Sequence, residues 1–379
     1  MTAMLRSFFL AGFECATGYN VHGRWFDQVV ATQHDRFADE DYARLRAIGI
    51  HAAREGVRWP LVDRAGRYDF STVVPFLAAS RRHGIDVVWD LFHFGYPDDA
   101  DPFAPGFSSR FAEYCHAVAR FVGAETAGVP WFTPVNEPSY FAWAGGEVGL
   151  FAPHARGRGP ELKRAVAAAA IRGIDAIRAA CPAARIVNVD ALCRVVPPRD
   201  RPELAAEADA FNDGAVFESW DVLCGRRLPE LGGSRAHLDV PGINYYWTNQ
   251  WELGLAGIPL AEDDPRCWSL GRLVRTVWNR YGGDVLITET SHVDEMRGPW
   301  VRDLADQAEA LLDDGVPLRG ICLYPILGMP EWHAPEQWTH MGLWDLVPQS
   351  PTLGRVPYEP MLSALREAQR LERRAGRRP

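Results

Sequence analysis

The chain has 379 residues, of which 47% are hydrophobic and 23% charged, a composition typical of globular proteins that excludes wholesale disorder and fibrous repeats. Its net charge of −9 disfavours a nucleic-acid partner, because there is no excess of cations to neutralise phosphates. No stretch approaches the roughly 18 uninterrupted apolar residues that a membrane span needs, so we expect no membrane partner. Residues 1–11 lack a cleavage-site pattern and are interpreted as the approach to a first strand.

The seven cysteines are scattered through the chain, at positions 15, 115, 181, 193, 224, 267 and 322. Their number is odd and no two form a Cys-x-x-Cys pair, which disfavours both a metal site and a disulfide framework. We therefore predict reduced thiols, no metal and no other cofactor, and a cytoplasmic protein.

In the first half of the chain, apolar runs predict four strands, at about 8–14, 52–57, 85–92 and 131–136. Between them, helical spacing predicts helices over 39–48, from an N-cap at Ser71 to Gly84, and from an N-cap at Ser108 to about 122. A loop rich in aromatic residues and glycine is expected over 139–159.

The second half repeats this alternation. Strands are predicted at 185–190, 238–246, 284–290 and 318–324, and helices at 161–180, 299–314 and 358–373. A short basic tail from about residue 374 is expected to be frayed.

Eight strands alternating with helices predict parallel strands joined by helical crossovers, and eight is the number that closes a barrel. We therefore predict an α/β fold, a (β/α)8 TIM barrel, with residues 1–379 as one domain. The alternative is a division into two domains near 195–210, where Pro197, Pro198 and Pro202 cluster.

Two of the predicted strands end in a glutamate, Glu137 before Pro138 and Glu289 after Ile287-Thr288. Burying a carboxylate is costly, so two of them at strand ends facing one cleft suggest acid and nucleophile chemistry on a glycosidic bond. A single strand-end glutamate is more often a helix cap or an ion pair. Other polar residues fall at the same ends of the strands: Glu14, Arg54, His93, Asn136, Asn244, Tyr246 and Glu331.

Six segments along the chain carry recognisable motifs: Ala53-Arg54 with Trp59, His93 with Pro97, Thr133-Pro134-Val135-Asn136-Glu137-Pro138, Gly242-Ile243-Asn244-Tyr245-Tyr246, Leu286-Ile287-Thr288-Glu289-Thr290-Ser291, and Tyr324 with Glu331-Trp332. Taken in order, they resemble the motifs of family 1 glycoside hydrolases, an eightfold-barrel family of clan A. The third has one residue inserted into that family's Thr-x-Asn-Glu-Pro, and the fifth keeps Thr-Glu but loses the following Asn-Gly. In the last, Tyr324 replaces a tryptophan.

The resemblance implies roles for the two glutamates. Glu137 would be the acid/base, its pKa raised by apolar walls and a nearby carboxylate. Glu289 would be the nucleophile, kept ionised by Arg54 and by a hydrogen bond from Tyr246. The carboxyl groups are expected roughly 5–5.5 Å apart, as in retaining enzymes.

The resemblance also implies a sugar site. Asn136 would hold the 2-hydroxyl, His93 and Glu331 other hydroxyls, and Trp332 or Trp344 would stack on the sugar's apolar face.

Each of these roles has a structural alternative. His93 and Trp332 could be packing residues, Asn244 could only support Glu137, and Arg54 could balance Glu55, although Glu55 should point to the opposite face of its strand. For Glu14, sugar binding and a structural role are equally supported.

Departures from the family bear on specificity. Gly328-Met329-Pro330 stands where the family has an Asp-Asn pair, and the chain is short, so we expect a changed floor of the sugar site and a more open cleft. Segment 337–341 lacks the lysine of members that act on phosphorylated sugars, which disfavours a 6-phosphosugar.

We therefore predict a retaining β-glycosidase that hydrolyses a small-molecule glycoside by double displacement. The alternatives are a transglycosylase that uses the same two glutamates and a catalytically silent sugar-binding protein. The oligomeric state is not predicted.

Overall fold

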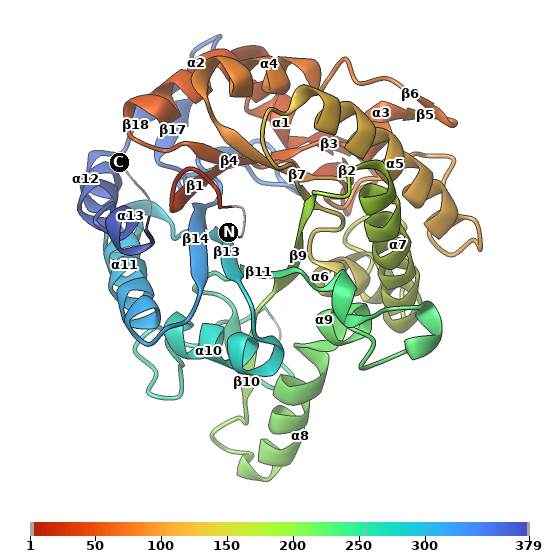
Figure 1. The fold of residues 1–379 in the computed structure, drawn as a ribbon. Coiled ribbons are helices and arrows are strands. Elements are labelled where there is room, and N and C mark those ends of the chain that lie inside the picture. The colour runs from red at the N-terminus through yellow and green to blue at the C-terminus, as the bar shows by residue number, and fades with distance from the viewer. Residues whose placement is uncertain (1–3, 256, 377–379) are drawn as a thin grey trace.

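The computed structural model describes residues 4–255 and 257–376. The end of the predicted basic tail lies outside these residues. Eight strands occupy the centre of Figure 1 and close into a barrel in the order β1-β14-β13-β11-β9-β8-β7-β4. They are β1 (Phe9–Gly12), β4 (Ala52–Gly56), β7 (Asp86–Asp90), β8 (Trp131–Thr133), β9 (Arg185–Ala191), β11 (Val240–Asn244), β13 (Val285–Thr290) and β14 (Leu318–Leu323).

Neighbouring barrel strands are parallel all the way round, and β1 closes the barrel against β4 through the pair Gly12 and Arg54. The predicted (β/α)8 barrel is therefore confirmed, and each of the eight predicted strands is one of the barrel strands.

Helices surround the barrel (Figure 1). The longer ones are α2 (His34–Ala47), α4 (Val74–His83), α5 (Phe107–Glu125), α7 (Gly159–Ala180), α10 (Leu270–Tyr281), α11 (Arg297–Asp313) and α12 (Glu359–Ala368). Shorter helices are α1 (Gln28–Ala31), α3 (Trp59–Val62), α6 (Pro138–Phe141), α8 (Ala205–Ala210), α9 (Glu218–Leu223) and α13 (Leu371–Arg374).

The segments that follow the barrel strands also contain two-stranded sheets. They pair β2 (Thr17–Tyr19) with β3 (Trp25–Asp27), β5 (Asp63–Arg64) with β6 (Arg67–Tyr68), β10 (Arg194–Val196) with β12 (Gln250–Glu252), β15 (Met329–Pro330) with β16 (Trp338–Thr339), and β17 (Trp344–Val347) with β18 (Gly354–Pro357).

Several predicted helix ends were wrong. The α4 helix is preceded by Val73 rather than capped by Ser71, and Pro75 occupies its first turn, where the missing N–H costs nothing. Ser108 lies inside α5, which begins after Gly106. The helix predicted over 358–373 is divided into α12 and α13.

Several segments, those of α8 and α9 among them, are more helical than the sequence analysis predicted. The expected loop 139–159 contains α6 and a π-helix over Ala142–Glu147. The α10 helix was not predicted, although Ser269 caps it by accepting a hydrogen bond from the backbone N–H of Arg272. These helices follow β8 and precede β13, the two strands that carry the glutamates.

The barrel interior is filled with apolar side chains. Leu10, Val88, Val187 and Leu286 belong to this inner cluster, and a second, larger core lies between the barrel and its helices. Gly12 leaves room for the ring of Tyr324, because a Cβ at that position would lie 1.9 Å from Tyr324 Cδ2. Because apolar side chains fill the interior, the polar side chains at the carboxyl ends of the strands lie together at one end of the barrel.

The seven cysteines are all free, which agrees with the prediction of no disulfide framework. Within the described residues, no helix is both long and apolar enough to cross a bilayer.

Candidate active site

The polar residues predicted to cluster do lie together at the carboxyl ends of the barrel strands. Arg54 lies in β4 beside Gly12 of β1, and Asn244 ends β11 beside Glu289 of β13. Asn136 and Glu137 follow β8, where the backbone N–H of Glu137 donates to the carbonyl of Val189 in β9. One end of the barrel therefore carries both glutamates.

Glu289 is held by two donors. Arg54 Nη1 lies 2.5 Å from its Oε1, and the hydroxyl of Tyr246 donates to its Oε2 at 2.9 Å. Burial and the charge of Glu289 raise the pKa of Tyr246 well above 10, so this hydroxyl keeps its proton and remains a donor. Both contacts that the sequence analysis expected at Glu289 are present.

Glu137 lies in a different environment. Burial raises its pKa to about 8, and the charges of Glu289 and Asp190 add to the effect, against a hydrogen bond from Asn244 Nδ2 at 2.9 Å. Its backbone has φ 43°, a left-handed conformation that is costly for a residue with a side chain. Glu137 thus holds its proton near neutral pH.

Two amides join the carboxyl groups. Asn136 Oδ1 accepts from Arg54 Nη2 at 2.7 Å and from Asn244 Nδ2 at 3.2 Å. The hydroxyl of Thr288 donates to Asn244 Oδ1 at 2.7 Å, which fixes the orientation of that amide. Asn244 therefore contacts Glu137, as expected if it supports that residue. It also belongs to the hydrogen-bond network that reaches Glu289.

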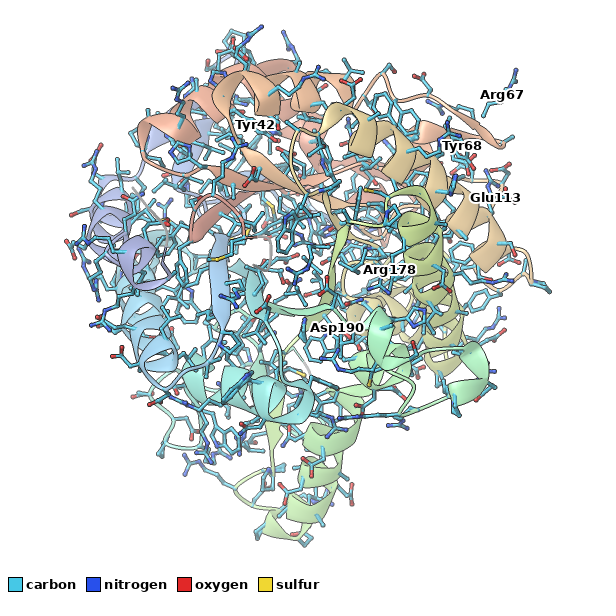
Figure 2. All side chains as sticks on the ribbon, in the orientation of Figure 1. Tyr42, Arg67, Tyr68, Glu113, Arg178 and Asp190 are labelled. Atoms are coloured by element: carbon cyan, nitrogen blue, oxygen red, sulfur yellow. The ribbon has the colours of Figure 1, made fainter. Side chains whose placement is uncertain are left out.

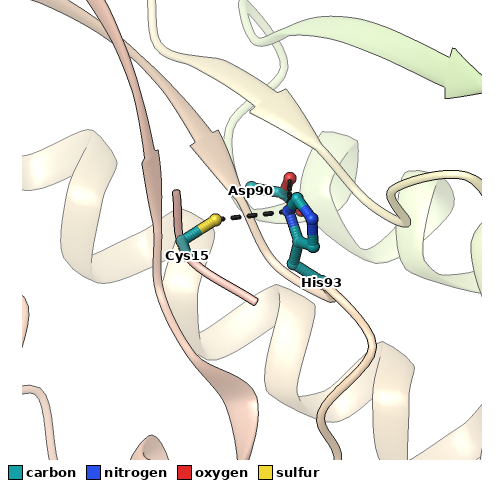
Figure 3. Close-up of side chains that lie close together, drawn as sticks. All are labelled: Cys15, Asp90 and His93. Carbon is teal, nitrogen blue, oxygen red and sulfur yellow. Dashed lines mark hydrogen bonds and ion pairs between the residues drawn. The ribbon is translucent and has the colours of Figure 1, made fainter. Parts of the chain in front are cut away.

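His93 is buried in the same network. Its Nε2 lies 3.0 Å from Asn136 Nδ2, and its Nδ1 lies 3.1 Å from Asp90 Oδ2 and 3.3 Å from Cys15 Sγ (Figure 3). Its ring is parallel to that of Tyr324, with the centroids 6.2 Å apart.

The alternative pairing of Arg54 with Glu55 is wrong. Glu55 Oε1 accepts from Tyr42 (labelled in Figure 2) at 2.7 Å and lies 2.9 Å from His34 Nε2, on the opposite face of β4. Arg54 instead places its guanidinium between Glu289 and Asp90, which lies 2.5 Å from Nη2.

Glu14 is buried close to this network, with Oε1 3.9 Å from His93 Nε2. The backbone N–H of Ala16 donates to the same oxygen at 2.8 Å, and burial raises the pKa of Glu14. Burial and the charges of Glu137, Glu14 and Glu331 raise the pKa of Tyr140, so these three carboxyl groups lie around one tyrosine.

The remaining predicted residues divide into two groups. Trp332 is half-buried and packs its ring edge to face with Phe94 and Phe151, at 5.8 and 5.5 Å between centroids, while the side chain of Glu331 is exposed. Trp344 is buried in β17, within the core between barrel and helices. Of these three residues, only Trp332 and Glu331 have exposed surface that a ligand could contact.

No family model matches the chain. A curated relative, the aryl-phospho-beta-D-glucosidase BglC of Bacillus subtilis, is 22% identical in an alignment that covers 80% of this chain and 79% of the relative. The AHE enzyme from Alicyclobacillus herbarius is 20% identical with a TM-score of 0.77, covering 97% of this chain and 98% of that one. A family 1 β-glucosidase from Thermotoga maritima is 16% identical with the same TM-score, covering 97% and 99%.

The chain has the fold of the family 1 β-glucosidases. The resemblance is thus confirmed at the level of the fold, over almost the whole length of the chain. Glu137 follows β8 and Glu289 lies in β13, which are the fourth and seventh barrel strands in chain order.

The sequence analysis missed three residues of this candidate site: Asp90, Asp190 and Cys15. Asp190 (labelled in Figure 2) is the last residue but one of β9 and accepts from Ser139, whose hydroxyl lies 2.5 Å from Oδ2. A carboxylate that ends an apolar strand was the signal that found Glu137, and the same signal was present at Asp190. Asp90 lies inside an apolar run, where burying a charge without a partner would be costly, and this cost was a signal that Asp90 has a partner.

Proposed function

We propose that this chain is a retaining β-glycosidase of family 1, with Glu289 as nucleophile and Glu137 as acid/base. The observation that carries the proposal is the unequal environment of two neighbouring carboxyl groups, one partly buried at Glu137 and one buried at Glu289. Arg54 and Tyr246 contact Glu289, whereas burial raises the pKa of Glu137 to about 8. Two nearby titratable groups in such different surroundings are typical of a site in which one group acts as the acid and the other does not.

In the first step, Glu289 attacks the anomeric carbon while Glu137 gives its proton to the departing oxygen. The glycosidic bond breaks and a covalent glycosyl ester forms on Glu289. In the second step, Glu137 takes a proton from water, the water oxygen attacks the anomeric carbon, and the ester bond breaks. Two inversions give net retention, and the two carboxyl groups should stand roughly 5–5.5 Å apart. The reaction requires neither a metal nor another cofactor.

The surrounding residues would bind the sugar. Asn136 would hold the 2-hydroxyl, an interaction that strengthens as positive charge develops on the sugar ring. His93, Glu14 and Glu331 would bind other hydroxyl groups, and the partly exposed ring of Trp332 would cover an apolar face.

We infer that the sugar is not phosphorylated, in contrast to the substrate that the name of the curated relative implies. Segment 337–341 contains no lysine, and the carboxylates of Glu14 and Glu331 would repel a phosphate.

The first experiment is turnover of a panel of nitrophenyl glycosides by the wild type and by Glu289→Gln. The panel contains both anomers of several sugars and the 6-phosphorylated forms. Cleavage of an unphosphorylated β-glycoside by the wild type alone is the expected result. Cleavage only of 6-phosphorylated substrates would refute the substrate proposal, and equal activity of the variant would refute the nucleophile assignment.

The two alternatives predict other outcomes. A transglycosylase would release the aryl group but pass the sugar to an added alcohol rather than to water, which product analysis would detect. A sugar-binding protein would bind a glycoside without turnover, and its affinity would be unchanged in Glu289→Gln.

A further inference from the structure

Asp90 is the buried carboxylate that joins the two halves of the polar network. It ends β7, and its Oδ2 contacts both Arg54 Nη2 at 2.5 Å and His93 Nδ1 at 3.1 Å. His93 continues to Asn136 at 3.0 Å, and Asn136 returns to Arg54 at 2.7 Å. These four side chains form a closed ring of hydrogen bonds next to Glu289.

Only one assignment of hydrogens satisfies this ring. Asn136 Oδ1 accepts from Arg54 and Asn244, so its Nδ2 must face His93. An amide nitrogen is a donor, so His93 Nε2 must be a bare acceptor, and the ring proton must then be on Nδ1, which faces Asp90. A proton on Nε2 would set two donors against each other, and turning the Asn136 amide over would do the same at Arg54 and Asn244.

The groups around His93 favour a proton on Nδ1, the nitrogen that faces both Asp90 and Cys15. Burial by itself lowers the pKa of His93, and the charges of Cys15 and Asp90 raise it well above 6.5. However, burial also raises the pKa of Cys15, so near neutral pH this residue is an uncharged thiol and does not attract the proton. Asp90 is then the acceptor that decides which nitrogen of His93 carries the proton.

We propose that Asp90 is a positioning residue, which holds His93 as the Nδ1–H tautomer and thereby fixes the amide of Asn136 toward the reacting sugar. The proposal rests on the proposed glycosidase function, in which Asn136 binds the 2-hydroxyl. Asp90 touches neither the substrate nor the reacting atoms. It acts through His93 and Asn136, and a partner that fixes the tautomer of a histidine is often as necessary as the histidine itself.

The same three groups have a rival use. Ligand atoms of Cys15, Asp90 and His93 lie within 4.8 Å of one another, which is close enough to hold a metal ion (Figure 3). The guanidinium of Arg54, 2.5 Å from Asp90, already supplies a positive charge there, and a second cation would be repelled. Cys15 and Asp90 also share one nitrogen of His93 rather than surrounding a common centre.

A double-variant cycle tests the proposal by activity. Asp90→Leu removes the acceptor, and we expect kcat/KM to fall roughly 10²-fold, mainly in kcat, as in Asn136→Ala. Asp90→Asn keeps an acceptor oxygen and should lose much less. The double variant of Asp90→Leu and Asn136→Ala should be no worse than Asn136→Ala, and the loss should be small with a 2-deoxyglycoside. Additive losses, or equal losses with both substrates, would overturn the proposal.

Thr133→Val is the matched control. Thr133 pairs with Asp90 across β7 and β8 and is equally buried, but its hydroxyl has no hydrogen-bond partner among the described residues. Its activity should therefore stay within about twofold of the wild type.

A spectroscopic test does not depend on activity. Two-bond ¹H–¹⁵N spectra, with His93→Gln used for assignment, should show His93 as the Nδ1–H tautomer in the wild type and Asp90→Asn, and lose that form in Asp90→Leu. Protonation on Nε2 in the wild type would overturn the proposal even if the enzyme is a glycosidase. If no glycoside is cleaved, the proposed function fails while the tautomer still tests Asp90. Stoichiometric Zn²⁺ binding that is lost in Cys15→Ser would assign the cluster to a metal and also overturn it.

Discussion

The ends of β8 and β13 deliver the same functional group into different surroundings. Glu137, after β8, accepts a hydrogen bond from one amide, and its removal from water together with the charges of Glu289 and Asp190 raises its pKa to about 8. Glu289, in β13, meets a guanidinium and a phenol. A barrel can thus place two glutamates in different surroundings by what the neighbouring strands contribute, Asn244 from β11 to the first and Arg54 from β4 to the second.

Glu289→Ala should have the largest effect on this pair. Removal of the nucleophile should reduce turnover roughly 10⁴-fold or more, because the covalent step is lost. Azide, which is small enough to enter the space vacated by the side chain, should restore cleavage with inverted product, as seen by proton NMR of the sugar. Ser291→Ala, at a buried hydroxyl without a partner among the described residues, is the control and should remain active. A fully active Glu289→Ala would show that Glu289 is not the nucleophile.

Glu137→Ala should divide substrates by their leaving groups. Poor leaving groups need the proton, so their cleavage should fall about 10²- to 10⁴-fold. Good leaving groups need none, and their first step should proceed nearly as in the wild type. Pre-steady-state release of dinitrophenol and of phenol from matched glycosides measures the difference. Equal losses for both would contradict the role of Glu137 as the acid.

The sequence was sufficient to predict the barrel. Parallel strands covered on both faces are continuous apolar runs, and all eight could be found from this pattern. The α10 helix was not predicted, although Leu270, Leu273, Val274 and Val277 have helical spacing. Helix ends such as those at Ser71 and Ser108 failed because many residues can precede a helix.

The candidate site was predicted only in part, for a physical reason. Residues that end strands could be found one strand at a time, which gave Glu137, Glu289 and Asn244. The role of Asp90 depends on register, because β7 must pair with β4 so that Gly56 lies beside Asp90 and Arg54 comes within reach. No pattern within one strand contains that information. Whether Trp332 and Glu331 bind a sugar stays a prediction.

Tyr246→Phe should lower the activity without abolishing it, because Glu289 loses one of its two hydrogen-bond donors. A hydrogen bond to a charged group is worth about 1.5–3 kcal/mol, which corresponds to roughly 10- to 10²-fold in rate. The reaction rate of the variant with a β-glycoside should fall by this factor, since the phenol no longer orients the nucleophile. Tyr245→Phe is a matched control, because the hydroxyl of Tyr245 accepts from Gln250 at 2.7 Å instead. A larger loss in the control would contradict the assignment.

The smallest effect concerns the pH dependence of Glu137. Its pKa of about 8 lies above that of an ordinary glutamate, so kcat/KM should be high at neutral pH and fall as pH rises through 8 and the acid loses its proton. The charge of Asp190 contributes to this shift. In Asp190→Asn the high-pH limb should therefore move to lower pH, by less than about one unit.

Asp239→Asn separates this effect from a general loss of charge. Asp239 pairs with Arg185 at the first residue of β9, whereas Asp190 lies near the end of the same strand, beside Glu137. The pH profile of Asp239→Asn should match that of the wild type. An unchanged limb in Asp190→Asn, or the same shift in both variants, would mean that the pKa of Glu137 is set by burial and Glu289 without Asp190.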